Sequence, residues 1–262
     1  MDLDHMKAVA LAAAHSGGSY IRSRLDRTRR IDHKGEIDLV TEADLGSERR
    51  IIDIIRASFP DHTILSEEHG LTEGRSAYKW IVDPLDGTTN FAHGLAACCV
   101  SIALVKENRP IIGIVWGPFT EELFSAVRGA GAYLNGRRLA VSGTDRIGDS
   151  LIATGFPYNV RTIMAPVMNR LTRCLEASQG IRRLGSAALD MCYVAAGRFE
   201  AFWEEQLQPW DTAAGHLIVT EAGGQVTDFD NRPFEPEMKS ILVSNGRIHH
   251  RMLELLDVKG TE

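Results

Sequence analysis

Two aspartates in one short segment give the sequence its clearest chemical signal. Residues 80–90 read Trp-Ile-Val-Asp-Pro-Leu-Asp-Gly-Thr-Thr-Asn, so an apolar strand leads to Asp83 and Asp86 follows three positions later. Two carboxylates at this spacing on a rigid turn can bind one or two hard cations, and the carbonyl of Leu85 can supply a third oxygen. The segment therefore predicts a cation site, although aspartates also form turns and cap helices without any ligand.

The next two residues add an anion-binding element. Gly87 permits a tight turn of the backbone, and Thr88 begins what could be a helix. The N–H groups at a helix start have no partners within the helix and attract an anion such as phosphate. A cation site and a phosphate cradle would then share one loop.

Two further acidic segments lie far from this loop in the sequence. Glu67 and Glu68 close an apolar run, and Asp211 precedes a stretch rich in alanine. In isolation, surface glutamates are usually solvated and an aspartate at a helix start is usually a cap, so both simpler interpretations stay open. If these acids converge on Asp83 and Asp86, each like charge added near 4 Å costs on the order of 4 kcal/mol at an effective dielectric of 20. Such a cluster is tolerable only with protonation or bound cations.

The donors in this set would all be oxygen atoms. The chain has nine histidines and four cysteines, but they show neither zinc-ligand spacing nor a His-Glu-x-x-His motif. Oxygen ligands favour Mg²⁺ first, and then Mn²⁺ or Ca²⁺, over Zn²⁺. A covalent nucleophile is not indicated, because Ser66 and the cysteines lack an adjacent histidine that would activate them.

The composition disfavours several classes of protein. The 262 residues carry a formal net charge of −6, which disfavours binding to the phosphate backbone of nucleic acid. The longest apolar stretch, Leu95 to Val105, is about half the ~20 residues that a membrane helix needs. Asp2 and Asp4 give the start of the chain the wrong sign for a signal peptide. The cysteines form no CxxC pair and are expected to be reduced. We expect a cytoplasmic protein that binds neither nucleic acid nor a membrane.

The first part of the chain predicts two helices followed by a largely antiparallel sheet. The helices are expected at about 4–25 and 44–57, the second from an apolar face that includes Leu45, Glu48 and Ile52. The strand candidates are 80–82, 99–105, 111–116 and 122–127, and Asn135-Gly136 is a strong hairpin signal.

After about residue 142 strands and helices alternate, which is typical of an α/β arrangement. Strands are expected near 151–153, 199–203 and 241–244, and helices near 161–178, 186–196, 211–222 and 247–257. The best internal boundary is 142–145. We therefore expect one unit, 1–262, with approximate lobes 1–142 and 143–262 that share one cleft.

At this point the residues resemble a known family, the inositol monophosphatases of the lithium-sensitive, magnesium-dependent phosphatase superfamily. The resemblance covers nearly the whole chain and is closest to the bacterial members. It implies an α+β or α/β fold layered as an α-β-α-β-α sandwich, usually dimeric. The segments that carry it are 38–44, 66–68, 80–91 and 209–215, supported by 153–158 and 182–190.

The resemblance also implies a role for individual residues. Two to three Mg²⁺ ions would be held by Glu67, Asp83, the carbonyl of Leu85, Asp86 and Asp211. The catalytic residues would be Glu67, Asp44 and Thr88, with the Thr88 hydroxyl bonded to Asp44. Substrate contacts would come from Asp86, Gly87, Thr88, Ala187 and Glu204, the last at inositol hydroxyls. Lys34 matches a basic residue on a loop of the family. Glu68 would at most contact a metal ligand, without binding the ion itself.

The implied activity is Mg²⁺-dependent hydrolysis of a phosphate monoester by an activated water, with myo-inositol monophosphate as the first candidate substrate and Li⁺ as an expected inhibitor. The alternatives are fructose-1,6-bisphosphatase, histidinol phosphatase and 3′-nucleotide phosphatase activity. The metal loop is common to all of them and cannot discriminate, whereas Glu204 and the short loops favour a small polyol. A non-catalytic regulatory protein on the same scaffold is a further alternative. The expected partners are the phosphate ester and a second copy of the chain.

Overall fold

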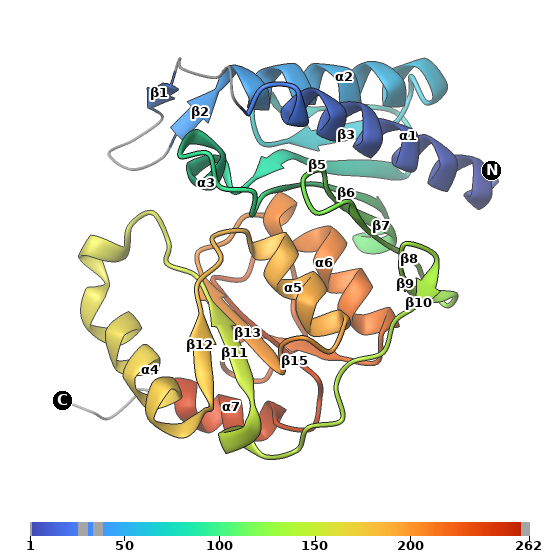
Figure 1. Cartoon of the computed structure of the whole chain (residues 1–262). Helices are drawn as coiled ribbons and strands as arrows, with labels where there is room; N and C mark the ends of the chain where they lie inside the picture. The colour runs from blue at the N-terminus through green and yellow to red at the C-terminus, as the bar shows by residue number, and fades with distance from the viewer. Residues whose placement is uncertain (1, 26–30, 34–38, 258–262) are drawn as a thin grey trace.

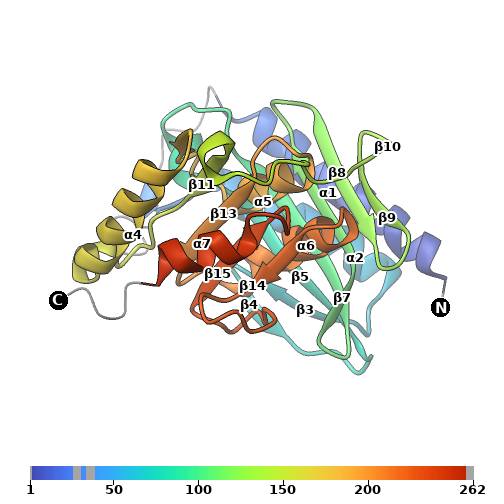
Figure 2. The same cartoon turned by 90° about the horizontal axis from the view of Figure 1, so that it is seen from below.

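Five layers of helices and sheets make up the computed structural model, which describes residues 2–25, 31–33 and 39–257 (Figure 1). Helices α1 (Leu3–Arg22) and α2 (Glu42–Ser58) form the first layer and an eight-stranded sheet the second. Helices α5 (Ala187–Ala195) and α6 (Pro209–Glu221) lie between this sheet and a five-stranded sheet. Helices α4 (Met164–Ala177) and α7 (His249–Leu256) cover the outer face of the second sheet (Figure 2). This arrangement confirms the predicted α-β-α-β-α sandwich.

The eight-stranded sheet has the order β10-β9-β8-β7-β6-β5-β3-β4. Strands β5 to β10 pair antiparallel with their sequence neighbours, as predicted, and only β3 runs parallel to its neighbour β5. Asn135 and Gly136 both have positive φ in the predicted hairpin between β9 and β10. The strands are β3 (Thr63–Ser66), β4 (Gly70–Thr72), β5 (Tyr78–Asp86), β6 (Cys99–Lys106), β7 (Arg109–Gly117), β8 (Glu122–Val127), β9 (Gly131–Leu134) and β10 (Arg137–Arg138).

The five-stranded sheet has the order β12-β11-β13-β15-β14. Strand β11 is parallel to both its neighbours, whereas β15 is antiparallel to both of its own. The strands are β11 (Leu151–Thr154), β12 (Gly180–Arg182), β13 (Ala201–Glu205), β14 (Gln225–Thr227) and β15 (Ser240–Ser244). The remaining elements are the pair β1 (Ile31–His33) and β2 (Leu39–Thr41), the short helix α3 (Thr88–Ala92) and the 3-10 turns Ile147–Asp149 and Val160–Thr162. Lys34 lies outside the described residues.

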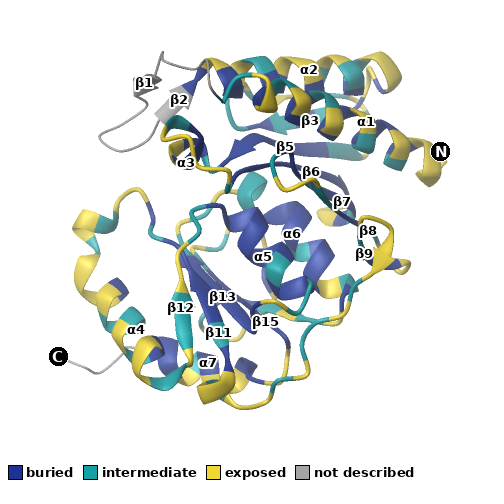
Figure 3. Ribbon diagram, viewed as in Figure 1, coloured by how far each residue is buried: buried dark blue, intermediate teal, exposed yellow. Residues whose placement is uncertain are grey.

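The two central helices are buried around most of their circumference, whereas α1, α2 and α4 expose one face (Figure 3). A helix that contacts a sheet on each side must be apolar all round, which explains the Ala-rich sequences of α5 and α6. No helix in the described part of the chain has the length and apolar character needed to cross a membrane.

The predicted apolar face of α2 is wrong in part. Leu45 is 49% exposed, whereas Asp44, Ser47 and Glu48 are buried together with Ile51 and Ile55. The helix therefore turns polar residues inward at its start. These residues form hydrogen bonds with the loops of the first sheet and so fix the position of the loop backbone. Apolar side chains at the same positions could only pack against the loops.

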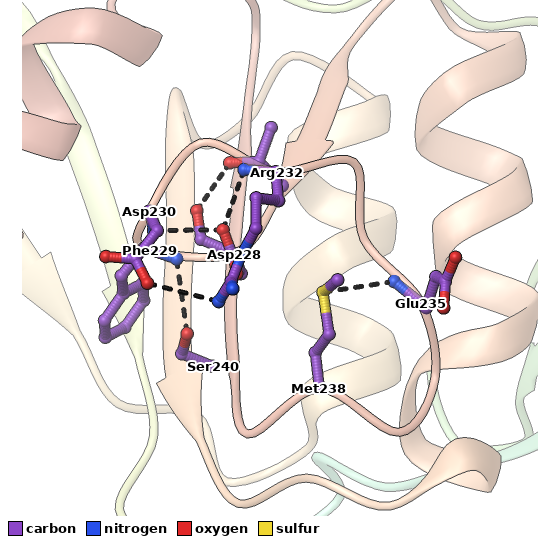
Figure 4. Close-up of polar contacts among 8 residues, drawn as sticks. Asp228, Phe229, Asp230, Arg232, Glu235, Met238 and Ser240 are labelled. Atoms are coloured by element: carbon purple, nitrogen blue, oxygen red, sulfur yellow. Dashed lines mark hydrogen bonds and ion pairs between the residues drawn. The ribbon is translucent and has the colours of Figure 1, made fainter.

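A loop between β14 and β15 is organised around one buried carboxylate (Figure 4). Asp228 accepts hydrogen bonds from the N–H groups of Asp230 and Arg232 at 2.9 and 2.8 Å, and from Arg232 Nε at 2.6 Å. The N–H of Phe229 donates to Ser240 Oγ at 3.2 Å, which ties the loop to β15.

We expect Asp228→Ala to lower the free energy of unfolding by about 2 kcal/mol, because three donors lose a buried charged acceptor. Urea unfolding checks this value. Asp149→Ala is the matched control, since its ion pair with Arg146 is solvent-exposed and contributes little. Equal midpoints for both variants would contradict the structural role of Asp228.

Candidate active site

One cavity of about 380 Å³ collects the residues that the sequence singled out. It lies where the ends of β3, β5 and β13 meet the starts of α3, α5 and α6. All the predicted site residues except Asp44 line this cavity. They are Glu67, Asp83, Leu85, Asp86, Gly87, Thr88, Ala187, Glu204 and Asp211. A larger cavity of about 430 Å³ lies between the β6–β7 turn, α6 and the segment around Phe234, and none of these residues lines it. The chemistry therefore favours the smaller cavity.

Asp83 combines a structural and a chemical role. Its Oδ1 accepts a hydrogen bond from the N–H of Leu85 at 2.9 Å, which forms the turn that interrupts the pairing of β5 with β6. The turn-forming interpretation of this aspartate is therefore correct, and the same side chain lines the cavity.

Asp86 joins the loop to α5. Its Oδ2 accepts hydrogen bonds from Ser186 Oγ at 2.7 Å and from the N–H of Ala188 at 2.8 Å, and the thiol of Cys99 lies 3.8 Å away. Ser186 is also the N-cap of α5. The hydrogen bond from Ser186 to Asp86 joins residues 100 positions apart, so the sequence around Ser186 does not reveal it.

Gly87 is required by the backbone at this position. Its φ is +93°, and a Cβ here would lie 2.8 Å from the carbonyl oxygen of Ala97. An L-residue would be strained by both the conformation and the collision. The turn at Gly87 starts α3 and places Gly87 and Thr88 in the wall of the cavity.

Thr88 connects the cavity to α2. Its hydroxyl lies 2.9 Å from Asp44 Oδ1 and 3.0 Å from the carbonyl oxygen of Leu85. The other oxygen of Asp44 accepts from the N–H and hydroxyl of Thr41, at 2.8 and 2.6 Å. Burial raises the pKa of Asp44, and the hydrogen bonds from Thr41 and Thr88 oppose that shift. The hydrogen bond that the resemblance implied is present in the structure.

Glu67 reaches the cavity because β3 is parallel to β5. Ser66 pairs with Val82, and the N–H of Glu67 donates to the carbonyl of Val82 at 3.2 Å, so the two strands end side by side. The buried carboxylate of Glu48 then accepts from the N–H groups of Glu68 and His69, at 3.1 and 3.2 Å. Sequence reasoning had placed Glu48 on an apolar face and missed this contact.

Asp211 enters from α6. It is the third residue of the helix, and its Oδ2 accepts a hydrogen bond from the N–H of Gln208 at 2.7 Å. The simple N-cap interpretation is therefore wrong, since Gln208 is the N-cap. Glu204 lies just upstream on β13 and is also buried.

The carboxyl groups act on one another in this cavity. Burial raises the pKa of Asp83 well above its usual range, and the charges of Glu67, Asp86 and Asp211 raise it further. Burial raises the pKa of Asp211 as well, and the charge of Asp86 is the next largest cause. In the described part of the chain, however, no group of three or more His, Cys, Asp or Glu side chains is arranged to hold a metal ion. The oxygen donors match the chemistry of Mg²⁺, but the side chains would have to move closer together to coordinate an ion.

Two lining residues were not expected from the sequence. Asp190 on α5 and Arg183 both line the cavity. The Arg183 guanidinium lies over the Phe156 ring, with its carbon 5.5 Å from the ring centroid. Both residues lie in segment 182–190, which supports the family resemblance, but the resemblance assigned neither of them a role.

Comparisons with known proteins show the family and the fold of the chain. Residues 2–259 match the inositol monophosphatase family. The inositol-1-monophosphatase of Synechocystis is 43% identical over 260 residues, covering 97% of this chain and 90% of that protein. The Nus factor SuhB of Haemophilus influenzae is 44% identical over 254 residues, covering 96% and 95%. The crystal structure of the extragenic suppressor protein suhB from Bartonella henselae has a TM-score of 0.92 at 39% identity, covering 96% and 98%. This chain belongs to the inositol monophosphatase family of phosphatases.

Proposed function

We propose that the protein hydrolyses the phosphate monoester of a small polyol, with myo-inositol monophosphate as the first candidate, and that it uses Mg²⁺. The observation that carries this proposal is the cavity of about 380 Å³, which brings the four acids Glu67, Asp83, Asp86 and Asp211 together with the Gly87–Thr88 turn and Glu204. An acidic cavity can accept a phosphate dianion only when cations offset the repulsion.

The ligands divide between two principal ions. Glu67, Asp83 and the Leu85 carbonyl would hold the first, and Asp83, Asp86 and Asp211 the second, with a weaker third near Glu67. Bound Mg²⁺ would offset the negative charge of the cavity and lower the pKa of a water molecule bound to it. The oxygen-only donor set and the raised pKa values of Asp83 and Asp211 support this assignment.

The chain's own groups orient the reactants. When the Thr88 hydroxyl donates to Asp44, its oxygen can accept a hydrogen bond from the attacking water and Asp44 can take up a proton. The N–H groups of Gly87 and Thr88 would donate to phosphate oxygens. The backbone of Ala187 and the carboxyl of Glu204 would contact the hydroxyl groups of the alcohol part.

A second candidate function is regulatory. Close relatives divide between an inositol-1-monophosphatase and proteins named Nus factor SuhB, at 43% and 44% identity. A regulatory protein without catalysis would keep this scaffold but release no phosphate from any ester in the presence of Mg²⁺. Homodimer formation and inhibition by Li⁺ are proposals that rest on the family resemblance, and a cytoplasmic location is a proposal that rests on the composition of the chain.

The substrate is tested by a panel. We expect the highest kcat/KM for myo-inositol 1-phosphate, compared with fructose 1,6-bisphosphate, histidinol phosphate and a 3′-nucleotide, with released phosphate measured at saturating Mg²⁺. A kcat/KM at least tenfold higher for the nucleotide would overturn the polyol assignment, since one misfitted group in a pocket changes discrimination by about that factor.

Asp86→Asn should lower kcat by about 100-fold or more and weaken Mg²⁺ binding, because it removes a charge from the proposed second ion site. Phosphate release gives kcat, and calorimetric titration with Mg²⁺ gives the affinity. Asp53→Asn, on the exposed face of α2, is the control and should leave both unchanged. Near-normal turnover in Asp86→Asn would contradict the assignment.

Thr88→Val preserves the side-chain shape but removes the hydroxyl that contacts Asp44. We expect kcat to fall by about 10² with little change in KM, since the hydroxyl orients water and does not bind the phosphate. Steady-state kinetics check this division. Thr172→Val, at an exposed site on α4, is the matched control. A variant in which only KM changed would assign Thr88 to substrate binding instead.

A further inference from the structure

Asp190 is a buried carboxyl group for which the described part of the chain provides no partner at one oxygen. It lies in the first turn of α5, is 1% exposed, and its Oδ1 is fully enclosed without a hydrogen bond. An unsatisfied buried polar atom destabilises a fold, so a native example requires an explanation such as a missing water, ion or ligand.

Other buried acids in the same chain do have donors. Asp44 accepts from Thr41, Glu48 accepts from the turn after Glu67, and Asp228 accepts from three donors in its loop. Glu200 accepts from the N–H of Leu151 at 2.7 Å. The fold therefore satisfies buried carboxylates at several places, and Asp190 departs from that pattern.

The cavity is the place from which a partner can reach Asp190. Its sequence neighbours Leu189, Met191 and Cys192 are buried in the helical layer between the sheets, so no solvent reaches the side chain from there. Asp190 lines the 380 Å³ cavity together with Glu204 and Arg183. A molecule in the cavity therefore lies beside the Asp190 side chain, and a rotation of the carboxyl group would bring the unpaired oxygen to it.

Glu204 is fixed beside this position. Its carboxyl lies against the backbone of Gly155, where a Cβ would come within 2.0 Å of Glu204 Oε2. Burial raises the pKa of Glu204 to about 8 and raises the pKa of Asp190 well above its usual range. A protonated carboxyl offers one donor and one acceptor, which matches the two capacities of a hydroxyl group.

Arg183 decides against a cationic ligand. Its positive charge lowers the pKa of both Asp190 and Glu204, opposing the larger effect of burial, so it acts electrostatically on both carboxyl groups. When the two carboxyl groups are protonated, an ammonium group placed between them would be repelled by the guanidinium, whereas neutral hydroxyls would not.

We propose that Asp190 is a specificity-determining residue that, together with Glu204, binds hydroxyl groups of a polyol phosphate in the cavity. This inference rests on the proposed function and adds a residue to it. Asp190 takes no part in phosphate transfer.

The test is Asp190→Leu, which keeps a similar volume and removes both oxygens. We expect KM for myo-inositol 1-phosphate to rise at least tenfold, while kcat/KM for 4-nitrophenyl phosphate, which has no hydroxyls on its alcohol part, stays within threefold. Binding of free myo-inositol, measured by calorimetry with Mg²⁺ and phosphate present, should weaken by the same factor as KM rises. The Tm without ligand should equal or exceed that of the wild type, since an unsatisfied buried group is removed.

Asp190→Asn is the conservative control and should keep KM for the polyol phosphate within threefold, because an amide retains a donor and an acceptor. If Asp190→Leu does not fold, Asp190→Ala replaces it with the same expected split between substrates. An unchanged KM for the polyol phosphate, an equal loss on both substrates, or a selective loss on histidinol phosphate would overturn the inference. Wild-type protein that hydrolyses 4-nitrophenyl phosphate but no polyol phosphate would instead overturn the proposed function, and this subsite with it.

Discussion

Mutual repulsion among carboxyl groups in one cavity is the constraint around which the rest of this structure is arranged. Glu67, Asp83, Asp86 and Asp211 come from three different elements and act on one another's protonation. A pair of such charges near 4 Å is unfavourable by about 4 kcal/mol at an effective dielectric of 20. Interactions among the acids themselves therefore cannot bring them together. Only the packing of two sheets and the helices between them can hold the acids in place.

The scaffold holds each acid by a backbone contact. Asp83 is fixed by the turn to Leu85, Asp86 by the first turn of α5, and Asp211 by the start of α6. Glu67 is placed by the end of a strand that runs parallel to β5. The same N–H groups that orient the carboxylates also reduce their repulsion, since they place positive dipole ends beside negative charge. Stability and site geometry therefore depend on the same hydrogen bonds.

Sequence reasoning succeeded where the signal was local. The loop from Asp83 to Thr88 lies within six consecutive residues, and the antiparallel strands and the Asn135-Gly136 hairpin follow from short patterns. Contacts between distant segments were anticipated only where the family resemblance implied them, as for Thr88 and Asp44. The bond from Ser186 to Asp86 spans 100 residues and that from Glu68 to Glu48 spans 20, so no periodicity reveals either.

The face of α2 shows why pattern reading misplaced residues. Its apolar period predicted that Leu45 would be buried, but the helix begins with Asp44, Ser47 and Glu48 directed inward to backbone and hydroxyl groups of the first sheet and its loops. A helix that supports a site departs from the simple amphipathic pattern at the turn nearest to the site. The layered fold and most of the acidic residues at the cavity could be anticipated from family likeness, whereas the places of Arg183 and Asp190 in the cavity wall required the tertiary structure.

The three aspartates share a feature that bears on the choice between ions of different size. Asp83 binds an N–H through Oδ1, and Asp86 and Asp211 do so through Oδ2, so each has one carboxylate oxygen engaged by the backbone. Each can then offer a metal one oxygen while keeping that bond. Calcium commonly takes both oxygens of a carboxylate and tolerates irregular coordination, whereas magnesium is smaller and takes single oxygens in an octahedron. If the three aspartates hold an ion as proposed, coordination through one oxygen each would disfavour the larger ion through backbone geometry.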